Sequence, residues 1–158
     1  MKRIFIIGLL FLYAFTLYSQ SNIRYYFKTL DIQDGLSQNT VNAILQDKQG
    51  FMWFGTKDGL NRFDGLSFRI FKKENSALGN NFITALHEDK EGNIWVGTYG
   101  GGLNVVEGSF PNLKFTHYQN GLELYPKNKY LRVRSLLCTS AGIMLAGTTD
   151  GLLTFSTN

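Results

Sequence analysis

Short apolar runs separated by polar, glycine-containing turns recur along this chain. One such run, Phe51–Gly55, lies between a turn that contains Asp47 and Gly50 and another that contains Asp58 and Gly59. Its residues are almost all apolar and do not alternate with polar ones, which is typical of a strand buried on both faces. Glycine recurs every few residues, which argues against a helical repeat because glycine destabilises helix interiors. The pattern therefore predicts an all-β chain.

The same pattern occurs three times. Trp53 and Trp95 lie 42 positions apart, and the residues around them match at the same offset. The matched pairs include Asn39 with Asn81, Asp47 with Asp89, and Gly55 with Gly97. A looser third copy lies 50 positions further along and has Leu145 in place of the tryptophan. The added residues fall around Gly108–Tyr130, which we predict to be a loop between repeats.

Each repeat is expected to contain four short antiparallel strands. The first strands are Val41–Gln46, Ile83–Glu88 and Val133–Cys138, and the second are Phe51–Gly55, Asn93–Gly97 and Ile143–Gly147. In the first repeat, Leu60–Phe63 and Phe68–Phe71 complete the set. Four strands in about 42 residues, with both sheet faces buried, describe one blade of a β-propeller. A β-sandwich would leave the repeat unexplained.

The chain is long enough for about three blades, which would form an incomplete ring. We divide it into a leader at residues 1–19 and a partial propeller at 20–158, with repeats at about 36–77, 78–130 and 131–158. Closed propellers usually have roughly four to eight blades, so we expect the N-terminal fragment of a longer protein or a truncated product. Tyr25–Leu30 is a further strand candidate, suited to the outer position of a final blade.

The N-terminus predicts export from the cytoplasm. Lys2 and Arg3 precede the uncharged, mostly apolar run Ile4–Tyr18, and a polar stretch begins at Ser19. This run is shorter than a membrane span and is typical of a secretory signal peptide, with an uncleaved anchor as the alternative. The formal net charge of +4 includes the two leader residues. The remaining charge is too weak and too dispersed for a nucleic-acid surface.

One set of motifs is familiar. It consists of Gly35–Asn39, Val41–Ile44, Asp47–Thr56 and Asp58–Asp64. Together they closely resemble the two-component regulator propeller repeats in the periplasmic sensor region of Bacteroidetes hybrid histidine kinases. The resemblance implies an extracytoplasmic sensor of carbohydrate, commonly an oligosaccharide, within an inner-membrane protein. It also implies further blades and kinase modules downstream as partners, with a homodimer left open.

The chain alone is not expected to be an enzyme. No kinase ATP-site signature is present, and neither His87 nor His117 has a phospho-acceptor context. The alternatives are a secreted propeller hydrolase or lyase acting on polysaccharide, and a protein-interaction scaffold. Glycoside hydrolysis needs two converging carboxylates, whereas most acids here are turn residues and Glu88 alone lies on a first strand. We therefore predict no catalytic residue.

Several conspicuous residues are interpreted as structural. Trp53 and Trp95 occupy equivalent strand positions, which indicates packing rather than sugar stacking. Gly100–Gly102 aligns with a hairpin turn and is not followed by a helix, so it is not a phosphate cradle. The histidines and turn aspartates lack metal-ligand spacing, so no metal and no cofactor is expected. Cys138 is the single cysteine, so no intrachain disulfide can form, and we expect a buried thiol that acts as a small hydrophobe.

Ligand recognition is expected where the copies differ. In an up-and-down blade, the turn after the second strand lies at the same end as the link to the next blade. That end collects Lys57, Asp58, Tyr99 and Asp150 as candidate ligand-binding residues. The segments Asn75–Asn81 and Asn120–Asn128 should lie beside them.

Overall fold

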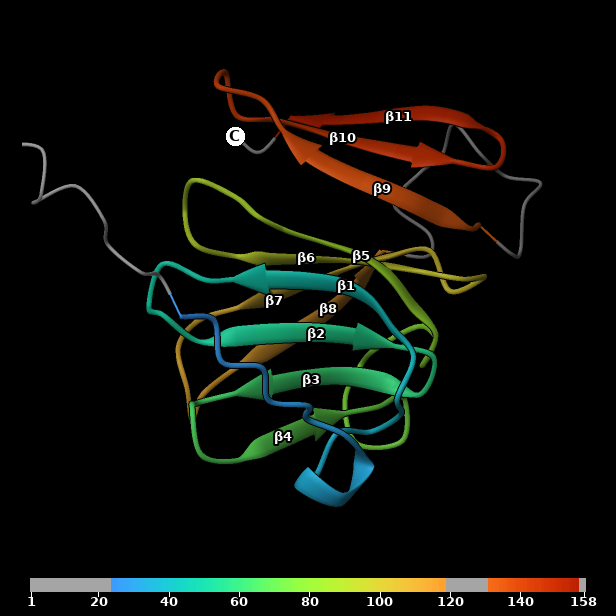
Figure 1. Ribbon diagram of the computed structural model, residues 1–158. Coiled ribbons are helices and arrows are strands. Elements are labelled where there is room, and N and C mark those ends of the chain that lie inside the picture. The colour runs from blue at the N-terminus through green and yellow to red at the C-terminus, as the bar shows by residue number, and fades with distance from the viewer. Residues whose placement is uncertain (1–23, 119–130, 157–158) are drawn as a thin grey trace, which may run out of the picture.

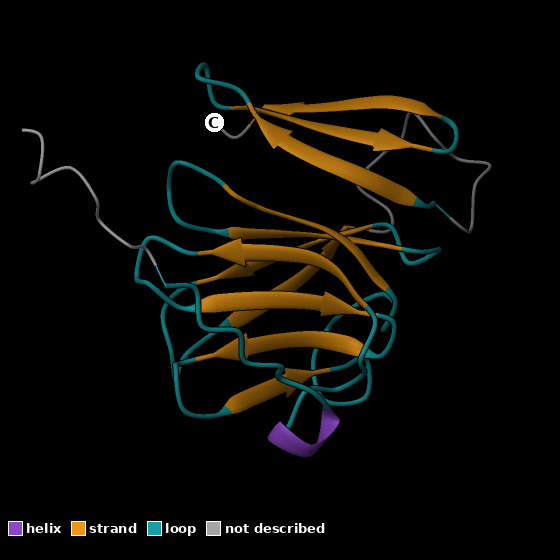
Figure 2. Ribbon diagram, viewed as in Figure 1, coloured by secondary structure: helices purple, strands orange, loops and turns teal. Residues whose placement is uncertain are grey.

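The computed structural model describes residues 24–118 and 131–156, whose regular structure is almost entirely β-strand (Figure 1, Figure 2). The first antiparallel sheet contains, in order, β1 (Val41–Gln46), β2 (Met52–Thr56), β3 (Gly59–Phe63) and β4 (Phe68–Phe71). The second contains β5 (Ile83–Glu88), β6 (Ile94–Thr98), β7 (Leu103–Glu107) and β8 (Lys114–Tyr118). The third contains β9 (Val133–Cys138), β10 (Ile143–Thr148) and β11 (Gly151–Ser156). A short 3-10 turn, η1 (Ile32–Asp34), precedes β1. The predicted fold, propeller blades of antiparallel strands in an incomplete ring, is confirmed.

Local turn chemistry sets the strand boundaries. The strands β1, β5 and β9 coincide with the predicted first strands, and β2 and β6 begin one residue later than predicted. In the turn between β1 and β2, the Asp47 carboxylate accepts the backbone N–H groups of Gln49 and Phe51 at 3.0 and 2.9 Å. Gly50 completes this turn with a φ of 92°, a value that glycine adopts without steric cost.

One predicted loop contains a strand. The sequence indicated a loop over Gly108–Tyr130, but β8 occupies Lys114–Tyr118 and pairs with β7 as the outer strand of the second blade. Its residues are mostly polar, and it has a sheet neighbour on one side only, so it lacks the apolar run that marks the inner strands.

One strand candidate depends on a final blade that is not among the three described sheets. Tyr25–Leu30 was predicted as a strand, but residues 24–30 form no strand. The residues Tyr25, Tyr26 and Phe27 are 76%, 87% and 96% exposed. A strand needs a partner for its backbone hydrogen bonds, and this segment pairs with none of the three described sheets. The leader at residues 1–19 lies outside the described residues.

The core lies between blades rather than within one. The strands β1, β5 and β9 are neighbours at the inner side of the stack. The apolar cluster between the first two blades contains Trp53 and Leu60 from the first together with Ile83, Ile94 and Val96 from the second. The first and second sheets thus each have an apolar face covered by the next sheet, as the non-alternating runs indicated.

Equivalent residues connect successive blades. The Asn42 side-chain amide donates to the Ile83 carbonyl at 3.0 Å, and one blade later the Thr84 hydroxyl donates to the Val133 carbonyl at 2.5 Å. The ammonium of Lys48 donates to the carbonyls of Asp89 and Lys90 at 2.9 and 2.6 Å. The ammonium of Lys90, its equivalent, donates to the Ser140 carbonyl. The turns after β1 and β5 are therefore each hydrogen-bonded to the same turn of the next blade.

Replacing Lys48 with methionine is expected to lower the free energy of unfolding by about 1 kcal/mol, because two hydrogen bonds between blades are lost while the apolar stem is kept. Urea denaturation followed by circular dichroism measures this change. Lys57→Met is the control, because Lys57 is an exposed lysine on the turn between β2 and β3. Its effect should stay below about 0.5 kcal/mol, and equal losses in the two variants would contradict a connecting role for Lys48.

The two tryptophans are structural, as their equivalent positions indicated. Trp53 is 2% exposed, and its indole N–H donates to the Asp47 carboxylate at 2.7 Å. Trp95 is 7% exposed and donates to Asp89 at 2.8 Å. In the third blade Thr139 replaces the aspartate and Leu145 replaces the tryptophan. Donor and acceptor change together, so no buried polar group loses its partner.

Candidate ligand-binding site

The stacked blades have two ends with different turns. At the first, the turns between second and third strands meet the links between blades; we call this the link end. The Gly59 N–H donates to the Asn81 carbonyl at 2.8 Å, and the Tyr99 N–H donates to the Phe82 carbonyl at 2.9 Å. These bonds confirm that the two kinds of loop lie together. The other end, which carries the β1–β2 and β3–β4 turns, is called the hairpin end.

The predicted binding residues lie on three successive turns of the link end. Lys57 is exposed, and Asp58 forms an ion pair with Lys72 at 2.6 Å. Tyr99 is 40% exposed, and its ring stacks on Phe82 with the ring centroids 5.1 Å apart. Asp150 is exposed on the turn between β10 and β11. The segment Asn120–Asn128 falls outside the described residues, and ligand binding by these residues stays a prediction.

Tyr99 already has an aromatic and a cationic neighbour. Besides the stack with Phe82, the Arg132 guanidinium lies 4.3 Å from the Tyr99 ring centroid. A sugar would therefore meet the exposed part of this ring and its hydroxyl. Tyr99 can act as a hydrogen-bonding group at the link end more readily than as an open stacking platform.

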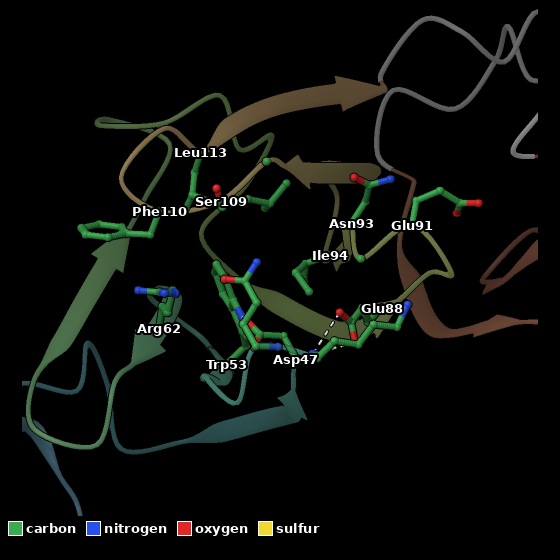
Figure 3. Close-up of a pocket in the computed structure, with 15 residues that line it drawn as sticks. Asp47, Trp53, Arg62, Glu88, Glu91, Asn93, Ile94, Ser109, Phe110 and Leu113 are labelled. Carbon is green, nitrogen blue, oxygen red and sulfur yellow. Dashed lines mark hydrogen bonds between the residues drawn. The ribbon is translucent and has the colours of Figure 1, made fainter.

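A cavity of about 350 Å³ lies at the hairpin end, between the first two blades (Figure 3). Its volume is within the range of small-molecule sites. In Figure 3, Arg62 and Phe110 lie on one side and Glu88 on the other. A second hollow of about 540 Å³ adjoins it and shares Gln49, Arg62 and Phe110 as lining residues. The sequence placed the candidate site at the link end and did not indicate either cavity.

Of the three carboxylates around the smaller cavity, those of Asp47 and Glu88 are engaged in structural contacts, and the third belongs to Glu91. Both oxygens of Glu88 accept the Lys48 backbone N–H, at 3.0 and 3.1 Å. The Asp47 carboxylate accepts the Trp53 indole N–H and two backbone N–H groups. Two free carboxylates facing each other, as glycoside hydrolysis requires, are therefore not found in this lining. Among the described residues, no group of three or more histidine, cysteine, aspartate or glutamate side chains could hold a metal ion.

Two arginines dominate the larger hollow. Arg62 on β3 is directly opposite Arg69 on β4. Arg62 is 7% exposed, and its guanidinium carbon lies 3.4 Å from the Phe51 ring centroid and 5.0 Å from that of Phe110. The guanidinium carbon of Arg69 lies 4.9 Å from the Phe110 centroid. Burial lowers the pKa of Arg62, and the nearby Asp47 and Asp64 carboxylates partly offset this effect.

The remaining candidates from the sequence have structural positions. The His117 Nε2 lies 2.7 Å from the Gly101 carbonyl oxygen, which connects β8 to the Gly100–Gly102 turn. That turn joins β6 and β7 as predicted, and its Gly102 carbonyl accepts the Thr98 N–H at 3.1 Å. Cys138 packs against the cluster around Trp95 but is half-buried rather than fully buried, because it ends β9 next to a turn.

The part of the chain described by the structure holds no helix that is long and apolar enough to cross a bilayer.

The fold and the inter-blade contacts define a β-propeller segment. Comparison with known proteins identifies its repeats. Residues 35–58 and 77–100 match the family model described as "Two component regulator propeller". These two segments are therefore two-component regulator propeller repeats, and the resemblance seen in the motifs is confirmed.

The relatives are much longer than this chain. Histidine kinase P4 of Formosa agariphila is 51% identical over 51 residues, which cover 32% of this chain and 4% of the relative. The extracellular domain of a protein described as a hybrid two-component system of B. thetaiotaomicron is 24% identical with a TM-score of 0.63, over 87% of this chain and 18% of the other. A second extracellular domain from that organism, described as a one-component system, is 18% identical with a TM-score of 0.65, over 89% and 18%. These two structures support the propeller fold.

Proposed function

We propose that this chain is the ligand-sensing propeller segment of an extracytoplasmic two-component regulator. The match of two repeats to the regulator propeller family carries the proposal, and the 51% identity to a histidine kinase supports it. Residues 1–19 would act as a secretory signal peptide. The full protein would be held in the inner membrane, with the segment in the periplasm.

The proposed ligand is an oligosaccharide, and the proposed partners are further blades and kinase modules of the same protein. Signalling would arise when the ligand changes the arrangement of blades or of two sensor copies. The hydrogen bonds between blades support this mechanism, because Lys48 and Lys90 each join one hairpin turn to the equivalent turn of the next blade. This segment would bind the ligand and pass the signal on, and catalysis would belong to the kinase modules.

Alanine at Lys57 or Tyr99 is expected to weaken oligosaccharide binding by the whole sensor region about tenfold, because each substitution removes one polar contact at the link end. Isothermal titration calorimetry with an oligosaccharide that activates the regulator measures the change. Lys114→Ala is the control, because Lys114 lies on an outer strand and pairs with Glu107 at 3.4 Å. Unchanged affinity in both link-end variants would exclude this face, and turnover of the sugar by the chain alone would contradict the sensor function.

A further inference from the structure

The arginine pair on β3 and β4 is not required by the blade fold. Like charges directly opposite each other on antiparallel strands are destabilising. In the second blade, the residues at the positions of Arg62 and Arg69 are Val105 and Thr116, which are also directly opposite each other. The second blade thus forms the same four-stranded sheet without arginines. The presence of two arginines in the first blade therefore needs an explanation other than the fold of the sheet.

Neither guanidinium has a carboxylate partner among the described residues. The ion pairs there join Lys72 to Asp58 and Lys114 to Glu107, and neither involves the arginine pair. Both guanidinium groups instead lie near the ring of Phe110, which comes from the loop after β7 in the second blade. Arg62 is 7% exposed as a residue, and the acids that influence its charge, Asp47 and Asp64, form no ion pair with it.

The one carboxylate in the larger hollow is committed to its own turn. Asp64 accepts the backbone N–H groups of Leu66 and Ser67 at 2.9 and 2.8 Å and the Ser67 hydroxyl at 3.2 Å. These hydrogen bonds hold the pKa of Asp64 below its ordinary value. Asp47, the other acid near Arg62, accepts two backbone N–H groups and the Trp53 indole N–H, so neither carboxylate is paired with an arginine of the hollow.

We propose that this hollow binds an anionic group of a small ligand, a carboxylate or a sulfate ester, between Arg62 and Arg69 and against the Phe110 ring. Guanidinium groups bind both oxyanions through paired N–H donors, which explains why arginine rather than lysine occurs here. The hollow is at the hairpin end, so this site is separate from the link end and goes beyond the sensing role proposed above. Since Phe110 belongs to the second blade, an occupied site connects the first two blades.

The test uses the purified chain with four probes at constant ionic strength: sulfate, chloride, galacturonate and galactose. We expect sulfate and galacturonate to raise the melting temperature in a saturable manner, and chloride and galactose to leave it unchanged. The relative affinities of the two anionic probes show whether the site prefers a sulfate or a carboxylate oxyanion. The double variant Arg62→Val/Arg69→Thr copies the second blade, so its sheet should form, and it should lose at least about tenfold in affinity for the anion.

Arg69→Thr alone removes an exposed cation and keeps the contact of the buried Arg62 with the Phe51 ring, so this variant is expected to fold. It should also weaken anion binding, whereas Arg132→Ala at the link end should leave it unchanged. The proposal fails if neither anion binds, or if both bind the arginine variants as tightly as the unaltered chain. Binding of a neutral oligosaccharide with no anion effect would likewise overturn it, while leaving the sensor function intact.

Discussion

Replacing Asp89 with alanine is expected to lower the free energy of unfolding by about 3 kcal/mol, because one buried carboxylate satisfies several donors at once. Asp89 is 2% exposed, and it accepts the Trp95 indole N–H at 2.8 Å. It also accepts the backbone and side-chain N–H groups of Asn93 at 2.8 and 3.0 Å. The alanine variant leaves the buried indole donor without a partner. Urea denaturation followed by circular dichroism measures the loss.

The third blade supplies the matched control. It has Thr139 and Leu145 where the second has Asp89 and Trp95, and the Thr139 hydroxyl accepts the Ile143 N–H at 3.0 Å. The double variant Asp89→Thr/Trp95→Leu removes donor and acceptor together. Its loss of stability should be smaller than the sum of the two single losses by about 1–2 kcal/mol. Strictly additive losses would show that the indole–carboxylate bond does not couple these residues.

The contribution of the Asp89 carboxylate to the stability of the fold depends on pH. Burial alone would raise the pKa of Asp89, but hydrogen bonds from Trp95 and Asn93 outweigh burial and hold it below the ordinary value of 3.8. The folded state therefore favours the carboxylate, so its contribution is present above pH 3.8 and is lost as the pH falls through the lowered pKa. Acid should thus destabilise the unaltered chain more than Asp89→Ala. Equal acid sensitivity would contradict this linkage.

The sequence predicted most of the fold because its decisive signals are local. A turn aspartate and a glycine with positive φ fix the end of one strand and the start of the next. Both residues can be recognised within a four-residue stretch of the sequence. The outer strand β8 was not predicted from the sequence. Its mostly polar residues, Lys114–Tyr118, resemble a loop when the neighbouring strand is unknown. The hydrogen bonds between blades also could not be predicted from the local sequence, since Lys48 contacts residues about 40 positions away.

Of the two candidate sites, one could be predicted from the sequence and the other could not. Topology alone predicted that Lys57 and Tyr99 would lie at the link end, and the backbone bonds at Gly59 and Tyr99 agree. The arginine hollow could not be predicted in that way, because Phe110 reaches it from another blade. One sequence signal was available: Arg62 is replaced by Val105 in the second copy. Comparing strand positions as well as turns would have singled it out.

Replacing Gly97 with alanine is expected to lower the free energy of unfolding by about 2–3 kcal/mol, because the added methyl group overpacks the contact between two blades. A Cβ at this position would lie 2.6 Å from Cγ1 and 3.0 Å from Cβ of Val133, which is fully buried on the inner strand of the next blade. The glycine of the recurring Gly-Thr pair is thus kept for close approach of sheets. The same urea titration measures this loss.

Gly147 provides the control, because the third blade has no described neighbour packed on that position. Its added Cβ would meet only the Ser135 hydroxyl closely, at 2.5 Å, and Ser135 is exposed and can rotate away. Gly147→Ala should therefore change stability by less than about 1 kcal/mol, and the lower entropy of the unfolded chain favours the alanine. Val133→Ala should in turn relieve part of the Gly97→Ala loss in the double variant. If Gly97→Ala costs no more than Gly147→Ala, close packing between blades does not explain why glycine recurs before the threonine.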